Sequence, residues 1–183
     1  MDLLALEHQF FTVLNSLSGR WHWLDLCAIV CAKYLIFVIF GTAIGWWISL
    51  HKTKSSAAWP LEGKKKWLIF GHLSLATIFS FLLNQQAALI HFRERPFLQT
   101  GTHRLVNPLS EKSFPSDHAA VAFAIAVAIF FYNKSLGVFL LLLGILIGLG
   151  RIYTGVHYPL DILGGAVVGI FTAVIFYHVL NRK

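Results

Sequence analysis

The residues best suited to chemistry in this chain are polar groups at the two ends of paired apolar segments. They form two short clusters, with Ser116, Asp117 and His118 before the segments and Arg151, His157 and Asp161 after them. If the segments are adjacent antiparallel membrane helices, both clusters lie at the same membrane boundary. The spacing therefore predicts one polar site, which Arg95 reaches from the preceding loop.

The cationic and hydroxyl groups of this predicted site are suited to bind an anion. Planar guanidinium groups such as those of Arg95 and Arg151 match the oxygens of a phosphate group. Ser116 stands where a membrane helix is expected to begin, and the free N–H groups and dipole of a helix N-terminus also favour negative charge. These residue types indicate a phosphate pocket.

The two histidines offer groups for nucleophilic and acid catalysis. His157 precedes Asp161 by four residues, which is about one helical turn. The carboxylate is therefore expected to accept a ring N–H and fix the tautomer, so that the other ring nitrogen becomes a nucleophile. His118 is then available to protonate the leaving oxygen as a general acid.

Composition places this site in a membrane. The chain has 183 residues, 57% of them hydrophobic and 13% charged, and its mean hydropathy is +0.68. Lipid offers no partner to backbone polar groups, so the long, unalternating apolar runs predict an all-α integral membrane protein rather than a barrel. Five crossings would use roughly 100 residues, which leaves residues 1–183 as a single domain. The net charge of +7 is typical of cytoplasmic lysines that fix orientation, and no nucleic-acid partner is expected.

The expected elements are an N-terminal amphipathic interfacial helix and a bundle of about five transmembrane helices. The interfacial helix covers residues 2–18 and carries one charge, Glu7, on its apolar stripe. The membrane helices are expected at residues 24–50, 67–90, 116–132, 136–152 and 160–180. The loop 51–66 holds five lysines and is expected in the cytoplasm, which places the catalytic motifs, within 91–161, at the extracytoplasmic face.

Three short motifs resemble the signatures of the type 2 phosphatidic acid phosphatase superfamily. They are Arg95-Pro96, Pro115-Ser116-Asp117-His118, and Arg151 with His157 and Asp161. The resemblance implies metal-independent hydrolysis of a phosphate ester through a phosphohistidine, without a cofactor. It implies that His157 is the nucleophile, Asp161 its partner and His118 the acid. It also implies that three residues hold the phosphoryl oxygens: Arg95, Ser116 and Arg151.

The chain departs from the family pattern at two positions. Ala88 stands where the family usually has a lysine, so a second phosphate-binding cation is expected from Arg93 or from Lys33, a charge inside the first span. Asp117 replaces a glycine, and this variant resembles the BcrC-type undecaprenyl-diphosphatases. A carboxylate beside a phosphate is costly unless it is paired. Asp117 is therefore expected to contact one of three cations: Arg93, Arg104 or Lys112.

The sequence thus favours a membrane-embedded phosphatase that releases phosphate from undecaprenyl diphosphate, with the lipid bilayer and a lipid phosphate as its partners and no obligate protein partner. Phosphatidylglycerophosphate, phosphatidic acid and a lipid A phosphate remain alternative substrates, because the apolar spans do not discriminate between lipid tails. A lipid or anion transporter that uses the arginines only for binding is the alternative from another class. Such a transporter would not require the pairing of His157 with Asp161.

Overall fold

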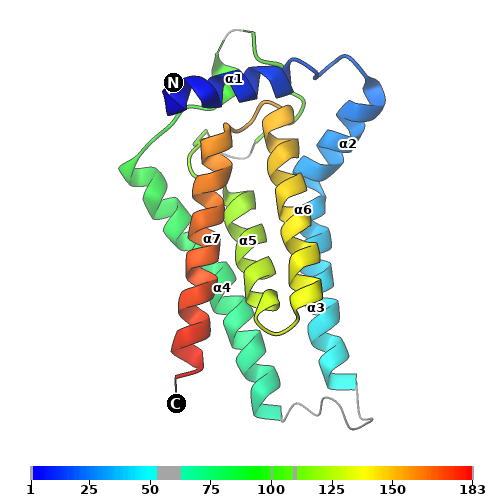
Figure 1. Ribbon diagram of the computed structural model, residues 1–183, viewed down its shortest axis with the longest axis vertical. Helices are drawn as coiled ribbons and strands as arrows, with labels where there is room; N and C mark the ends of the chain where they lie inside the picture. Colours follow the sequence, from blue (N-terminus) through cyan, green and yellow to red (C-terminus); the bar gives the residue numbers. More distant parts are fainter. Residues whose placement is uncertain (1, 53–62, 100, 109–110, 183) are drawn as a thin grey trace.

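The protein is a bundle of helices with one helix lying across its end. The computed structural model describes residues 2–52, 63–99, 101–108 and 111–182, and within these ranges it contains helices and no strand. The helices are α1 (Leu3–Asn15), α2 (His22–Lys33), α3 (Leu35–Lys52), α4 (Gly63–Ile90), the short 3-10 helix η1 (Pro96–Leu98), α5 (Asp117–Phe130), α6 (Lys134–Tyr153) and α7 (Pro159–Leu180). Helices α3 to α7 run along the long axis, and α1 lies across one end (Figure 1). The predicted all-α membrane fold is confirmed.

The helices differ in their capacity to cross a membrane. In the described part of the chain α4, α6 and α7 are each long and apolar enough, and α2 with α3 meets the same criterion as a bent pair. Helix α5 is apolar but has only 14 residues. At 1.5 Å per residue it is about 21 Å long, shorter than the hydrocarbon layer of about 30 Å. Four spans of full length therefore surround the shorter α5, which runs along the same axis (Figure 1), where five full-length spans were expected.

Helix α5 is buried because small residues let its neighbours approach closely. Its buried positions are mostly alanine, and it packs mainly against α6 and α7. A Cβ atom on Gly165 or Gly169 of α7 would collide with the carbonyl oxygen of Ser116 or Ala120, respectively. This close packing of small residues is typical of membrane helices. It fixes the beginning of α5 against the beginning of α7.

The first span is broken, and the prediction of one continuous helix over residues 24–50 is wrong at Tyr34. Helix α2 ends at Lys33, α3 starts at Leu35, and the two axes differ by 47°. The last carbonyl groups of a helix lack intrahelical partners. One of them, the carbonyl of Ala32, accepts a hydrogen bond of 3.3 Å from Nη1 of Arg151 on α6. The break therefore frees a backbone oxygen that holds a predicted site residue.

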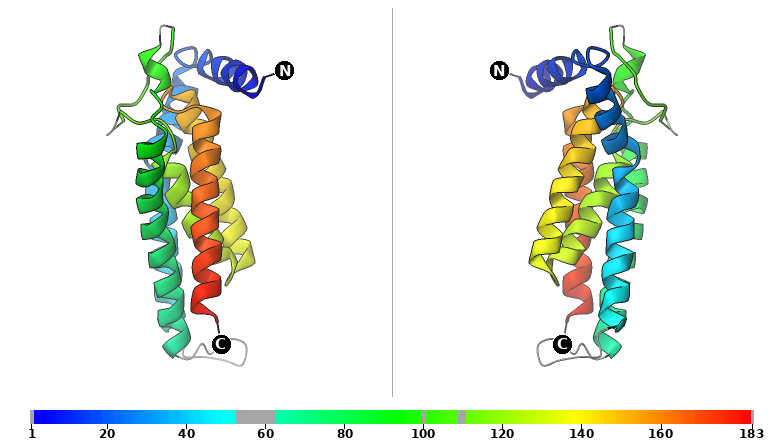
Figure 2. Two further views of the ribbon diagram at one scale, coloured as in Figure 1. Left: turned by 90° about the vertical axis from the view of Figure 1, so that its left-hand side faces the viewer. Right: turned by 90° about the vertical axis from the view of Figure 1, so that its right-hand side faces the viewer.

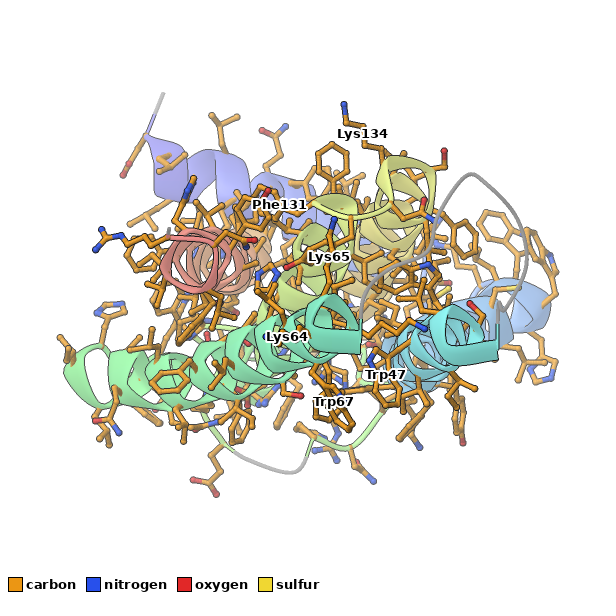
Figure 3. The ribbon with its side chains drawn as sticks, turned by 90° about the horizontal axis from the view of Figure 1, so that it is seen from below. Trp47, Lys64, Lys65, Trp67, Phe131 and Lys134 are labelled. Atoms are coloured by element: carbon orange, nitrogen blue, oxygen red, sulfur yellow. The ribbon has the colours of Figure 1, made fainter. Side chains whose placement is uncertain are left out.

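The two ends of the bundle have different chemistry. Lys64, Lys65 and Lys134 all face the end remote from α1 (Figure 3), and near the first two the rings of Trp47 and Trp67 meet with centroids 5.8 Å apart. Residues 53–62 of the lysine-rich loop lie outside the described residues. The described residues of the loop 91–115 lie at the opposite end, beside α1 (Figure 1).

Helix α1 presents two different faces. Glu7, Phe11 and Asn15, spaced by four residues, are buried against the bundle. Its exposed surface includes the large apolar residues Leu3, Leu4, Leu6, Phe10 and Val13. The helix extends beyond the side of the bundle (Figure 2), as expected of a helix that rests in the membrane interface.

Candidate active site

The predicted clusters meet at the end of the bundle that α1 crosses. Arg151 lies in the last turn of α6, and His157 lies in the turn that leads to α7. The backbone N–H of Ser116, the N-cap of α5, donates to the carbonyl of Asp161 on α7 over 2.9 Å. The turn bends at Gly155, which has a φ of +75° and packs against the carbonyl of His103, so that a side chain has neither the conformation nor the space there.

Two arginines point at one nitrogen of His157. Nη1 of Arg95 and Nη2 of Arg151 are each 3.3 Å from Nε2 of His157. A guanidinium group has only donors. Nε2 is therefore assigned as the acceptor, and the ring proton is assigned to Nδ1. The lone pair of Nε2 thus lies between two cations.

The carboxylate of Asp161 faces the other ring nitrogen. Its Oδ2 is 3.5 Å from Nδ1 of His157, an ion-pair distance that is too long for a good hydrogen bond. His157 precedes α7, so the pair is not formed across a helical turn as predicted. Asp161 is held instead by Ser113 Oγ at 2.5 Å, by the N–H of Tyr158 at 2.7 Å and by Arg93 Nη1 at 3.2 Å.

Burial controls the protonation of His157. Desolvation, together with the charges of Arg151 and Arg95, lowers the pKa of its imidazole to about 4, against the opposing influence of Asp161. The imidazole is therefore neutral near pH 7. The neutral ring is the form that acts as a nucleophile.

Two further buried donors suited to an anion lie at the start of α5 and in the last turn of α6. Ser116 Oγ and Arg151 Nε are buried and have no hydrogen-bond partner among the described residues. Unpaired buried donors each cost about 1–3 kcal/mol, and donors of this kind can bind the oxygens of a phosphate group. Arg95 is 4% exposed and donates to the carbonyl of Val156 over 2.8 Å. Burial lowers the pKa of its guanidinium.

Asp117 and His118 open α5 directly after Ser116. Oδ1 of Asp117 accepts from Lys112 Nζ at 2.7 Å, from Asn84 Nδ2 at 2.6 Å and from Gln85 Nε2 at 3.1 Å. Among the three predicted partners of Asp117, Lys112 is the one that the structure confirms. His118 is half-buried and lies close enough to Arg151 and His157 to interact with them electrostatically.

The structure does not bring either predicted second cation to Nε2 of His157. Lys33 is exposed, with its ammonium 5.7 Å from the ring centre of Tyr34. Arg93 is held by Glu7 and Asp161. The expected proximity of Lys33 to the pocket fails because the break in the first span turns this residue outward, while Ala32 faces Arg151.

Sequence reasoning did not assign roles to several residues of the site. Ser113 and Glu7 contribute directly to the network around Asp161, and Asn84 and Gln85 hold Asp117. The one available signal was Glu7, a charge on an apolar stripe. The other contacts join residues far apart in the sequence, and no local pattern predicts them.

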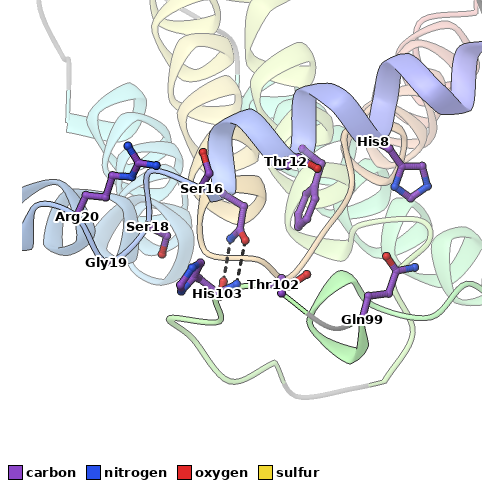
Figure 4. Close-up of a pocket in the computed structure, with 12 residues that line it drawn as sticks. His8, Thr12, Ser16, Ser18, Gly19, Arg20, Gln99, Thr102 and His103 are labelled. Carbon is purple, nitrogen blue, oxygen red and sulfur yellow. Dashed lines mark hydrogen bonds between the residues drawn. The ribbon is translucent and has the colours of Figure 1, made fainter.

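A polar cavity of about 490 Å³ lies beside the site, between α1 and the loop around residues 99–103 (Figure 4). His8, Arg20 and His103 are among its lining residues, and none of the proposed catalytic residues lines it. Asn15 bonds His103 twice, by donating to its carbonyl at 2.8 Å and accepting from its N–H at 2.9 Å. These bonds hold α1 over the loop.

A neutral histidine between two arginines, at the end of a bundle of membrane helices, suits phosphate chemistry in a membrane protein. The chain belongs to the PAP2 superfamily, whose sequence profile matches residues 69–183. It is therefore a multi-pass membrane protein and a lipid phosphatase of that superfamily.

Named relatives cover nearly the whole chain. Undecaprenyl-diphosphatase BcrC of Bacillus subtilis (strain 168) is 30% identical over 94% of this chain and 83% of that protein. The putative undecaprenyl-diphosphatase YbjG of Escherichia coli (strain K12) is 28% identical over 97% of this chain and 86% of that protein. The crystal structure of LpxE from Aquifex aeolicus superposes with a TM-score of 0.69 at 29% identity and covers 94% of both chains.

Proposed function

We propose that this protein hydrolyses undecaprenyl diphosphate to undecaprenyl phosphate and inorganic phosphate at the extracytoplasmic face of the cell membrane. The observation that carries the proposal is the position of His157, whose Nε2 lies 3.3 Å from a nitrogen of each of two arginines while Nδ1 faces Asp161. The undecaprenyl substrate is supported by two relatives that bear its name.

The first step transfers the terminal phosphoryl group to His157. Nε2 attacks phosphorus, the bond from phosphorus to the bridging oxygen breaks, and His118 gives its proton to that oxygen. The leaving group is undecaprenyl phosphate. The positive charge that develops on the imidazole is balanced by Asp161, whose Oδ2 is 3.5 Å from Nδ1.

The second step releases phosphate. His118, now neutral, accepts a proton from water, and the water oxygen attacks phosphorus as the bond from phosphorus to Nε2 breaks. Inorganic phosphate leaves, and His157 returns to its neutral state. The two steps together return the protein to its starting state.

The phosphoryl oxygens are proposed to bind Arg95, Arg151 and Ser116. The buried and unpaired Oγ of Ser116 and Nε of Arg151 supply donors, and the N-terminus of α5 adds N–H groups and a favourable dipole. Preorganised donors that face developing charge are an effective source of rate enhancement. Lys112, paired with Asp117 at the start of α5, is a better placed second cation than Lys33.

Charge distribution supports the extracytoplasmic position of the site. Lys64, Lys65 and Lys134 lie at the end of the bundle remote from α1 (Figure 3), and lysines mark the cytoplasmic ends of membrane helices. Four basic residues at the other end are engaged in the site or its support. Arg95 and Arg151 contact His157, Arg93 contacts Asp161, and Lys112 contacts Asp117.

Phosphate release by the purified protein in detergent, with a chelator present, tests the proposal. Wild-type protein is expected to hydrolyse undecaprenyl diphosphate, and His157→Ala is expected to lower kcat on the order of 10³-fold or more without reducing the yield of folded protein. Normal activity in this variant would exclude His157 as the nucleophile. Binding of lipid phosphates without turnover of any of them would favour a transporter.

The substrate is tested separately with a panel. The panel compares undecaprenyl diphosphate, undecaprenyl phosphate, phosphatidylglycerophosphate, phosphatidic acid and a lipid A phosphate. The highest kcat/KM is expected for undecaprenyl diphosphate. A higher value for a glycerolipid or lipid A phosphate would retain the phosphatase and replace its substrate.

A further inference from the structure

Glu7 is a buried carboxylate that the two steps above leave without a role. Its side chain is 2% exposed, and it lies on the face of α1 that covers the bundle. Carboxylates are almost never fully buried unless they are paired. The partners of Glu7 therefore indicate what the residue does.

These partners connect α1 to the carboxylate that faces His157. Nη1 and Nη2 of Arg93 donate to Oε1 and Oε2 of Glu7 at 3.0 and 2.7 Å, in a two-pronged pair. The same Nη1 donates to Oδ1 of Asp161 at 3.2 Å. The guanidinium also lies 4.0 Å from the ring centre of Tyr158, which limits its movement. One nitrogen of Arg93 thus bridges Glu7 and Asp161.

The charges of this group have a direct consequence for His157. Two carboxylates and one guanidinium leave one net negative charge. Because Glu7 neutralises Arg93, the charge of Asp161 remains effective at the imidazole. With the charge of Glu7 removed, Arg93 would pair with Asp161 alone, cancel its charge and draw Oδ1 toward itself.

We propose that Glu7 is a positioning residue for phosphoryl transfer. Through Arg93 it fixes the orientation of Asp161 and preserves the negative charge that supports His157 as it becomes positive. This inference rests on the proposed roles of His157 and Asp161. It makes the interfacial helix α1 part of the support of the active site as well as a contact with the membrane.

A purely structural role for Glu7 makes a different prediction. Oε1 of Glu7 also accepts from the backbone N–H of Leu160 at 2.9 Å, which satisfies a free donor in the first turn of α7. A glutamine has nearly the same shape and retains an oxygen for this bond. Glu7→Gln therefore removes the charge while leaving the contact between α1 and α7 in place.

The test measures kcat, KM and the thermal midpoint of the full-length protein in detergent, with a lipid phosphate that the wild type hydrolyses. Glu7→Gln is expected to lower kcat about 10-fold or more, to change KM less than about twofold, and to leave the midpoint within a few degrees. Asp2→Asn is the matched control, because Asp2 is an exposed acid that caps the same helix and asparagine caps equally well. The control is expected to match wild type in all three quantities.

A double-mutant cycle with Arg93→Met tests the route of the effect. If Glu7 acts through Arg93, Glu7→Gln changes kcat less than about twofold when Arg93 is already methionine. The same fold-loss in both backgrounds, or wild-type kcat in Glu7→Gln, would overturn the proposal. If Glu7→Gln does not fold, Arg93→Lys takes its place, because lysine keeps the charge and lacks the planar fork. A wild-type kcat in Arg93→Lys would also overturn it.

Failure of the proposed function gives a different pattern. A wild type that is inactive on every lipid phosphate, or a fully active His157→Ala, overturns both the reaction and the role of Glu7. An active wild type with an inactive His157→Ala and an unaffected Glu7→Gln overturns the role of Glu7 alone.

Discussion

The protonation of His157 is set by groups with opposite effects. The residue is 2% exposed. Burial and the charges of Arg151 and Arg95 disfavour the imidazolium, Asp161 favours it, and the pKa is lowered to about 4. The ordinary pKa of histidine is about 6.5. Between these two values the unfolded chain binds a proton at this position and the folded protein does not.

Acid is therefore expected to destabilise the protein through His157. At higher pH neither state is protonated there, and below about pH 6.5 the free energy of unfolding falls by up to about 1.4 kcal/mol per pH unit. The loss is on the order of 2 kcal/mol at about pH 5. Glutamine does not bind this proton, so the free energy of unfolding of His157→Gln should fall less on acidification. Thermal unfolding in detergent at about pH 7.5 and about pH 5 measures the difference.

The control for this experiment is His178→Gln, which changes an exposed histidine on α7. It is expected to lose as much stability on acidification as the wild type. An equal loss in wild type and His157→Gln would show that His157 is protonated alike in the folded and unfolded states.

Local motifs predicted the residues around His157 better than they predicted the residues that hold Asp161 in place. Ser116, Arg151 and Asp161 belong to short clusters with recognisable spacing, so their types pointed to phosphate chemistry. The bond from Ser113 to Asp161 joins residues 48 apart, and the pair of Glu7 with Arg93 joins residues 86 apart. Such pairs depend on how helices meet, which the pattern within one helix does not determine.

Helix limits followed the apolar runs closely wherever a helix is continuous. The spans expected at residues 67–90, 136–152 and 160–180 correspond to α4, α6 and α7. The expected span 24–50 differs because the sequence stays apolar through the break at Tyr34. The break coincides with a tertiary contact, the hydrogen bond from Arg151 to the carbonyl of Ala32, and hydropathy does not report such a contact.

The close packing of α5 on α7 is expected to be sensitive to a single methyl group at Gly165. A Cβ atom there would collide with the carbonyl of Ser116 and lie 3.0 Å from Cβ of Ala119. Gly165→Ala must push away the start of α5, which carries Ser116 and His118. We expect a loss of about 1–3 kcal/mol in stability. We also expect turnover to slow by about 10-fold or more, because a shift of about 1 Å in a catalytic group can cost about 10²-fold.

Gly71→Ala is the matched control for this substitution. Gly71 lies within α4, and an added Cβ atom would have no neighbour within 4 Å. Alanine favours a helix over glycine by roughly 1 kcal/mol, so the thermal midpoint should stay the same or rise, with kcat unchanged. An equal loss of turnover in both variants would show that the effect of Gly165→Ala does not arise from its contact with α5.

The whole molecule has an apolar side surface between two polar ends. Large exposed apolar side chains occur on α3, α4, α6 and α7, for example Phe37, Leu82, Leu142 and Val167. Such a surface is suited to contact with lipid tails. At this scale the sequence was sufficient to predict a helical bundle with an apolar side surface, because a bilayer imposes both helix length and side-chain type.

The orientation of the bundle makes a prediction that does not depend on turnover. If the lysine-rich end is cytoplasmic, Asn107 lies outside and Lys134 lies inside. Each is exposed and outside the proposed catalytic groups. The two natural cysteines, Cys27 and Cys31, are first replaced by alanine. Asn107→Cys and Lys134→Cys are then made separately in this background, and both variants should keep their activity. In intact cells a membrane-impermeant maleimide should label Asn107→Cys within minutes and Lys134→Cys only after the membrane is opened.

The reverse labelling pattern would place the site in the cytoplasm and exclude an extracytoplasmic phosphatase. It would do so without affecting the roles of His157, Asp161 or Glu7, because their contacts are the same in either orientation. It would also mean that Arg93, Arg95 and Lys112 obey the positive-inside rule after all. Their positive charge would then need no explanation from phosphate chemistry. The labelling result therefore decides whether the basic loop at the site breaks the positive-inside rule. If it does, the need to bind phosphate explains why its positive charges are kept.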